Sequence, residues 1–167
     1  MDVAALDGMP KAEFVAAVAP LFEGASHFLD RLANARPFGG ADEMFRRSRA
    51  IALSMPESEQ IELIDAHPRL GAPPPSVSAM SYGEQGYDRE TTQAIAELVK
   101  LNEQYESRFG FRFCVFVAGR SRAELVPVLE AALSEARPAE IQRALKDVVL
   151  IAQDRFQKVT RTAEGVG

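Results

Sequence analysis

The sequence predicts an all-α fold, a single domain over residues 1–167 built as a bundle of about seven to eight helices with an irregular, proline-rich middle loop. Three observations predict this class. Apolar residues recur at helical spacing along most of the chain. Prolines, glycines and capping residues separate the periodic segments. The length of 167 residues, 47% of them hydrophobic, suits one domain with a substantial core.

Three helices are predicted in the first third of the chain. Pro10 suits the first turn of a helix, where its missing N–H would be unsatisfied in any case, and that helix ends before Pro20. Ser26 is expected to cap a second, amphipathic helix that ends ahead of Pro37. A third helix is predicted from residue 41 to about residue 53.

The fourth predicted helix leads to a histidine and a proline-rich loop. Ser54 and Glu57 form a capping-box pattern around a proline in the first turn, which predicts a helix start. That helix ends near His67, because Pro68 disfavours the α conformation of the residue before it. Residues 69–80 are rich in proline and lack periodicity. We expect this stiff loop to cover or shape a site.

A long helix and an extended connector are predicted next. Asp88 is expected to cap the helix, which runs to Phe109 and is followed by Gly110 as its terminating residue. Residues 111–117 are rich in β-formers but few in number. We therefore expect an extended connector at this point rather than part of a sheet.

The C-terminal part of the chain predicts two more helices. Ser121 and Glu124 make another capping-box pattern, and the helix behind them is expected to run to about Ala136. Pro138 is expected to start the last and longest helix, which runs to about Thr160. We find no internal repeat, which agrees with a single domain.

Composition argues against several classes of partner. The net charge of −5 is unsuited to nucleic acids and to anionic membranes, since both attract basic surfaces. No apolar run approaches the roughly 18–20 residues that a membrane span requires. The first residues lack the basic and apolar regions of a secretory signal. We therefore expect a cytoplasmic protein with no nucleic-acid or membrane partner.

The sequence gives little support for a metal site or for a catalytic nucleophile. One cysteine excludes an internal disulfide, and two histidines with one cysteine cannot form a zinc site without several carboxylates. Cys114 lies in an apolar run, which favours a buried structural thiol over a nucleophile. The sequence has neither a glycine-rich phosphate loop nor a nucleophile elbow.

Two titratable residues, His67 and Glu84, are candidates for an acid–base pair. His67 is either a catalytic imidazole or a helix-end histidine whose charge the helix dipole stabilises. Glu84 belongs to the pattern Ser81-x-x-Glu84, which is either another capping box or part of a site. Glycines on both sides of Glu84 weaken a helix start and let a ligand approach the backbone closely. The residues alone leave these alternatives open.

Two further polar residues fall on apolar helix faces. Asn102 is expected to fasten a neighbouring loop, because a buried amide needs its hydrogen bonds. Arg155 continues the apolar stripe of the last helix beyond Val148. A guanidinium on that stripe either binds an anion or several acceptors, or extends to solvent from the edge of the stripe.

Three stretches of the chain together resemble the 2-oxo-4-hydroxy-4-carboxy-5-ureidoimidazoline decarboxylases of uric acid degradation. They are His67-Pro68-Arg69-Leu70-Gly71, Ser81-x-x-Glu84-Gln85, and Leu101-Asn102-x-x-Tyr105-x-x-Arg108-Phe109-Gly110-Phe111-x-Phe113. Arg155 on the final helix is a weaker fourth piece. The pieces occur in the expected order over nearly the whole chain, and their combination is specific.

The resemblance implies an all-α, homodimeric enzyme that uses no cofactor and converts this ureidoimidazoline to (S)-allantoin and CO2. The catalytic residues that it implies are His67 and Glu84. The substrate-binding residues that it implies are Pro68, Ser81, Gln85, Phe113, Val115 and Arg155. Phe113 and Val115 would contribute through their backbone.

The implied mechanism gives each residue a task. His67 would transfer a proton, with a pKa near the operating pH. Glu84 would hold the His67 tautomer or stand close to the substrate carboxylate, and Arg155 would anchor an anionic oxygen. Two rival functions remain. One is a non-catalytic helical interaction module, in which these residues do not converge, and the other is a hydrolase of a related ureide.

Overall fold

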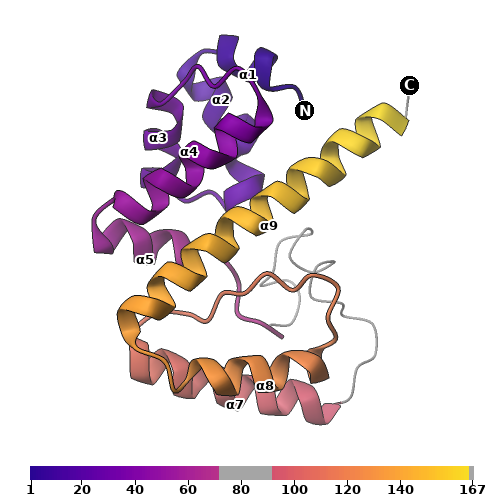
Figure 1. Cartoon of the computed structure of the whole chain (residues 1–167). Helices are drawn as coiled ribbons and strands as arrows, with labels where there is room; N and C mark the ends of the chain where they lie inside the picture. The colour runs from indigo at the N-terminus through magenta and orange to yellow at the C-terminus, as the bar shows by residue number, and fades with distance from the viewer. Residues whose placement is uncertain (72–91, 166–167) are drawn as a thin grey trace.

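The computed structural model describes residues 1–71 and 92–165, and every regular element within those ranges is helical (Figure 1). The first part contains α1 (Val3–Gly8), α2 (Lys11–Val18), the 3-10 helix η1 (Ala19–Phe22), α3 (Ser26–Asn34), α4 (Ala41–Ser54) and α5 (Glu57–Asp65). The second part contains α7 (Thr92–Phe109), α8 (Arg122–Ala132) and α9 (Arg137–Gly165). The predicted all-α class is confirmed.

The long helix α9 runs across the molecule and contacts both the N-terminal part of the chain and residues 114–116 (Figure 1). Helices α4 and α5 and the 3-10 helix η1 pack on it from the N-terminal part of the chain. Helices α7 and α8 pack against each other near the start of α9. Residues 111–120, called the connector below, cross between that pair and α9 without regular structure, as predicted.

Aromatic packing joins the connector to the end of α7. The ring of Tyr105 lies 4.5 Å from that of Phe109, 5.7 Å from that of Phe111 and 5.2 Å from that of Phe113, between centroids. All four rings are buried. Gly110 turns the chain between them with a φ of 81°, a left-handed conformation that suits glycine and agrees with the predicted helix end.

Two predicted helix caps are wrong. Ala25 is the N-cap of α3, and the hydroxyl of Ser26 donates instead to Glu62 of α5 at 3.4 Å. Ser54 remains in the last turn of α4, and Pro56 precedes α5 without a side-chain cap. Ser54 is the last residue of α4, and its hydroxyl donates to the carbonyl of Ile51 at 3.3 Å within that helix rather than capping α5.

The remaining helix ends agree better with the sequence. Ser121 and Glu124 form the predicted capping box, with bonds of 3.1 and 2.8 Å between each side chain and the backbone of the other residue. Helix α8 ends at Ala132, a turn earlier than expected, and α9 continues to Gly165, beyond its expected end. The predicted cap Asp88 and most of the proline-rich loop lie outside the described residues.

Helix α1 has no counterpart in the sequence predictions. It contains six residues, begins at the cap Asp2, which accepts a hydrogen bond from the backbone of Ala4 at 3.2 Å, and buries Val3 and Leu6. Six residues make fewer than two turns, which is too short for a periodic apolar pattern to be recognised.

Candidate active site

The last turn of α5 determines the orientation of His67. The backbone N–H of His67 donates to the carbonyl of Ile64 at 3.1 Å, and the ring atom Nδ1 lies 2.9 Å from the carbonyl oxygen of Leu63. A carbonyl oxygen can only accept a hydrogen bond, so Nδ1 carries the ring proton. The other ring nitrogen, Nε2, therefore carries the free electron pair of the neutral imidazole.

Burial makes His67 a neutral base. The residue is 4% exposed, and its buried Nε2 atom has no hydrogen-bond partner among the described residues. Burial, followed by the positive charge of Arg155, lowers the pKa of His67 from an ordinary value of 6.5 to about 4. The expected pKa near the operating pH is therefore wrong, because the sequence did not show how deeply the ring is buried.

A cavity of about 210 Å³ lies beside His67. Three segments line it: the residues after α5, the connector and one face of α9. The lining residues are His67, Pro68, Leu70, residues 113–119, Ile151, Asp154, Arg155 and Lys158. A cavity of this size suits a small metabolite rather than a macromolecular ligand.

Five of the predicted site residues meet at this cavity, namely His67, Pro68, Phe113, Val115 and Arg155. The other three, Ser81, Glu84 and Gln85, lie outside the described residues, so their roles stay predictions. Cys114 also lines the cavity and is buried, as expected of a structural thiol. The convergence of residues from three distant segments favours a binding site over a set of unrelated helix caps.

Arg155 is buried and tied to the N-terminal part of the chain. Its side chain is 1% exposed, which excludes a guanidinium that extends to solvent. One terminal nitrogen donates to the carbonyl of Pro20 at 2.9 Å, and the other donates to a carboxylate oxygen of Glu23 at 2.8 Å. Arg155 therefore joins α9 to the segment at η1 and places a positive charge beside the neutral ring of His67.

Asn102 fastens the chain just after the histidine, as predicted. Its side-chain amide donates to the carbonyl of Leu70 at 2.9 Å, and the residue is buried on α7. Leu70 itself lines the cavity. A residue outside the cavity thus positions part of its wall.

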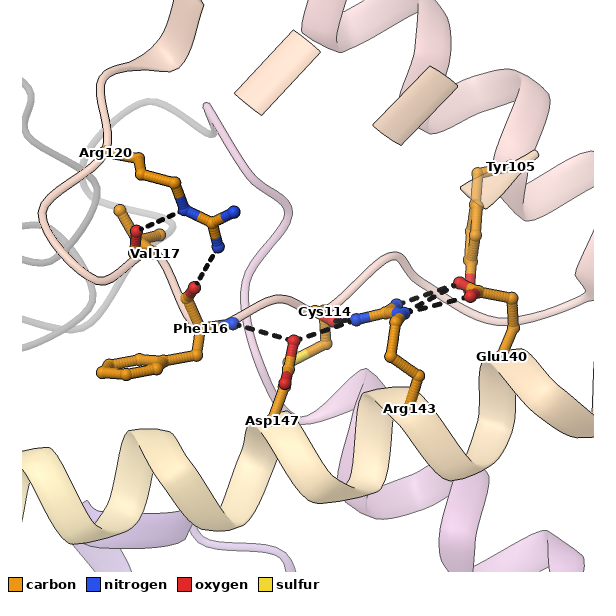
Figure 2. Close-up of polar contacts among 8 residues, drawn as sticks. All are labelled: Tyr105, Cys114, Phe116, Val117, Arg120, Glu140, Arg143 and Asp147. Atoms are coloured by element: carbon orange, nitrogen blue, oxygen red, sulfur yellow. Dashed lines mark hydrogen bonds and ion pairs between the residues drawn. The ribbon is translucent and has the colours of Figure 1, made fainter. Parts of the chain in front are cut away.

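Charged residues of α9 hold the connector in place (Figure 2). Arg143 donates to the carbonyl of Cys114 at 3.0 Å, and Asp147 accepts from the backbone N–H of Phe116 at 3.2 Å. Arg143 also donates to Asp147 and to Glu140, each at 3.0 Å. Arg143 and Asp147 therefore bond to the connector and to each other.

Tyr105 of α7 extends this network. Its hydroxyl donates to Glu140 at 2.7 Å in a fully buried position (Figure 2). Burial and the neighbouring carboxylate raise the pKa of Tyr105 well above its ordinary value, so the hydroxyl remains a donor. Burial also raises the pKa of Asp147, although the guanidinium of Arg143 opposes that shift.

Sequence reasoning missed several of these residues. Glu140, Arg143 and Asp147 are spaced three and four residues apart on α9, which is the spacing of intrahelical ion pairs and could have identified the network. Asp154 and Lys158 were also missed; they line the cavity and pair at 2.7 Å. Charged pairs at this spacing usually face solvent, so the pattern alone does not indicate a site.

The described part of the chain contains neither a cluster of metal-ligating side chains nor a helix that could span a membrane. Within residues 1–71 and 92–165, no group of three or more histidine, cysteine, aspartate or glutamate side chains is placed to hold a metal ion. None of the helices described there has the length and apolarity needed to cross a bilayer.

A buried, neutral imidazole and a buried arginine at one small cavity define a helical domain suited to proton transfer on a small molecule. Residues 7–157 match the model of the OHCU decarboxylase family, where OHCU is 2-oxo-4-hydroxy-4-carboxy-5-ureidoimidazoline. The chain belongs to this family, which confirms the resemblance seen in its sequence motifs.

Relatives and solved structures agree with this membership. The chain is 33% identical over 142 residues to the uric acid degradation bifunctional protein of Bacillus subtilis, covering 83% of the chain and 28% of that relative. It is 28% identical over 163 residues to an OHCU decarboxylase of Halalkalicoccus jeotgali, covering 96% of the chain and 92% of that relative. A crystal structure of OHCU decarboxylase in the presence of (S)-allantoin matches with a TM-score of 0.70 at 22% identity, covering 84% of this chain and 94% of that one.

The chain is shorter than some of its relatives. It spans 32% of the bifunctional protein of Bacillus sp. TB-90 and 28% of that of Bacillus subtilis.

Proposed function

We propose that this chain decarboxylates OHCU to (S)-allantoin in the degradation of uric acid, without a cofactor. The observation that carries the proposal is the Nε2 atom of His67, a neutral base at the wall of a small cavity. Membership of the OHCU decarboxylase family supports the substrate.

The substrate supplies its own electron sink. When the bond to CO2 breaks, its electron pair moves toward the neighbouring ring imine, whose nitrogen takes up a proton from solvent. The hydroxyl on the reacting carbon then loses its proton and becomes a carbonyl, while the adjacent carbon gains a proton on one face. The protein has to orient the breaking bond perpendicular to the imine plane and to transfer these protons.

His67 is proposed to accept the hydroxyl proton. Its Nδ1–H is held by the Leu63 carbonyl, so its Nε2 atom is the ring nitrogen available for a proton. Because that carbonyl already holds the tautomer, we assign to Glu84 the other role considered for it, close to the substrate carboxylate. A negative charge there would favour the loss of CO2.

The other residues are proposed to bind and orient the ring. Arg155 would anchor an anionic or carbonyl oxygen, and the backbone at Phe113 and Val115 would bond to the ring amides. Ser81 and Gln85 would bond to the ureido group, and Pro68 would form part of the wall. The described members of this set line one cavity, which supports a common ligand.

The two histidines of the chain provide a matched test. His67→Asn should lower kcat by about 10²–10⁴-fold, since it removes the general base. His27→Asn should leave kcat unchanged, because His27 is an exposed residue paired with Glu62. Freshly made OHCU, from uricase and hydroxyisourate hydrolase, is the substrate, and circular dichroism follows the formation of (S)-allantoin.

The same assay tests the rival functions. A wild-type rate no faster than spontaneous decay would remove the decarboxylase proposal and leave the interaction module or the ureide hydrolase. Normal activity of His67→Asn would remove the assignment of the base alone. We also propose a cytoplasmic homodimer, which the family resemblance suggests; the mass of the purified chain by light scattering tests the oligomeric state.

A further inference from the structure

The two peptide groups around Val115 have a defined direction. The carbonyl of Cys114 faces Arg143, and the N–H of Phe116 faces Asp147, both on α9. Each of these groups shares a planar peptide with a group of Val115, and both peptides are trans. In a trans peptide the C=O and N–H point in opposite directions. The N–H and C=O of Val115 therefore both point away from Arg143 and Asp147.

The backbone of Val115 has no other role in the described structure. Neither its N–H nor its C=O makes a hydrogen bond to a residue within the described ranges. Val115 is half-buried and lines the cavity. The N–H donor and the C=O acceptor of Val115 belong to one residue and can be used together. They can pair with the C=O and N–H of an amide or urea group, as paired residues of two antiparallel β-strands do.

We propose that Arg143 and Asp147 are positioning residues, which aim the backbone donor–acceptor pair of Val115 at the cavity and so determine its affinity for ring amide or ureide groups. This inference rests on the proposed function for the identity of the substrate. The two residues act through the connector, and neither lines the cavity itself.

The network is suited to orient the backbone rather than to stabilise the fold. Partly buried charged groups lose favourable hydration on folding. The attraction within an ion pair does little more than offset this loss, so such pairs add little net stability. Their geometry is nevertheless restrictive. The guanidinium of Arg143 lies 5.0 Å from the ring centre of Phe113 and bonds to the next residue of the connector. Arg120 holds the far end by donating to the carbonyls of Phe116 and Val117 at 2.7 and 3.0 Å.

Two variants of Asp147 test the proposal. Asp147→Ala removes the acceptor for the Phe116 N–H, and we expect KM to rise about tenfold, the effect of one lost hydrogen bond, with kcat within about threefold of wild type. Asp147→Asn retains a side-chain oxygen that can accept this bond, so it should recover most of the lost affinity. The pH profile of kcat should stay unchanged in both variants, since His67 is untouched.

Arg36→Ala is the matched control for a general loss of stability. Arg36 is also half-buried and also donates to backbone carbonyls, those of Leu6 and Met9 at 3.0 and 2.6 Å, but lines no part of the cavity. Its KM should equal that of wild type. A nitrogen–proton NMR titration with (S)-allantoin provides a second measurement, in which the Val115 amide should shift in wild type and shift much less in Asp147→Ala.

The outcomes separate this inference from the proposed function. An inactive wild-type enzyme would remove the proposed function, while the Val115 amide in the titration would still test the positioning role. A folded Asp147→Ala enzyme with wild-type KM would overturn the inference. An equal rise of KM in Arg36→Ala, or no recovery in Asp147→Asn, would also overturn it.

Discussion

Helix α9 carries two arginines that face the interior, and they connect it to opposite parts of the molecule. Arg155, 1% exposed, bonds to Glu23 and to the carbonyl of Pro20 in the N-terminal part. Arg143, 31% exposed, bonds to two carboxylates and to the connector. The first lies at the cavity beside His67, and the second lies behind the cavity wall.

The comparison shows how burial produces both a base and a donor. Near Arg155, burial and the positive charge keep His67 neutral, and a neutral imidazole can accept a proton. Near Arg143, burial and the carboxylate of Glu140 keep Tyr105 neutral, and a neutral phenol can donate a hydrogen bond. The same physical cause therefore keeps an imidazole neutral at one end of α9 and a phenol neutral at the other.

Alanine at the two arginines should give the largest and most informative difference. Arg155→Ala should lower the free energy of unfolding by about 3–5 kcal/mol, because it breaks a mostly buried ion pair with Glu23 and the hydrogen bond to the carbonyl of Pro20. Arg143→Ala should cost less, about 1.5–3 kcal/mol, since the Arg143 side chain is itself 31% exposed and Glu140 still accepts a hydrogen bond from Tyr105. Urea denaturation followed by circular dichroism measures both values.

A third arginine supplies the control for this ranking. Arg46 pairs with Glu43 on the surface of α4, with 67% of its side chain exposed, so Arg46→Ala should change stability by at most about 1 kcal/mol. If Arg143→Ala lowered the free energy of unfolding more than Arg155→Ala, the ranking by the burial of the arginine would be wrong.

The pH dependence of stability should report the neutral state of His67. In the unfolded chain this histidine binds a proton below its ordinary pKa of 6.5, whereas the folded protein resists protonation down to a pKa of about 4. The unfolded state therefore binds more protons between these values, and stability should fall as the pH decreases from 6.5 to 4, by at most about 3 kcal/mol.

Replacement of the histidine isolates this contribution. His67→Asn should show a shallower loss of stability over the same pH range, because it has no proton to bind. The activity of wild type should likewise lack a protonation step near pH 6.5. Equal pH dependence in the variant and in wild type would show that His67 is not held neutral by its surroundings.

Much of the fold could be predicted because helix periodicity and punctuation are local signals. Gly110, Pro68 and the Ser121–Glu124 capping box each end or start a helix by their own chemistry, and the structure has them in those roles. The serines at positions 26 and 54 could not be interpreted in this way. Their hydroxyls bond to groups whose position depends on how far the neighbouring helix extends or on a distant helix.

The site was predicted unevenly for a similar reason. His67 and Arg155 stood out because one is scarce and the other interrupts an apolar stripe. The pKa of His67 could not be predicted, since it depends on packing of three distant segments. The role of Asp147 was hidden for the same reason: its partner is a backbone N–H of the connector, and backbone groups carry no sequence signal.

Among the buried groups, the smallest effect is expected at Tyr105, which contacts Glu140, a partner of Arg143. Tyr105→Phe removes the donor to Glu140 and should lower the free energy of unfolding by about 1–2 kcal/mol at neutral pH, as measured in urea. KM should stay within about twofold, because Arg143 retains its bond to the Cys114 carbonyl.

Alkaline pH should distinguish this hydroxyl from a merely well-packed ring. The unfolded tyrosine loses its proton above an ordinary pKa of 10, whereas the folded protein retains it, so the folded state then binds more protons. Wild type should therefore lose stability as the pH rises above 10, and Tyr105→Phe should lose less over the same range. Equal losses in both proteins would mean that the phenol is not held neutral by burial and Glu140. The Arg143 region would then differ from the His67 region in the state of its buried group.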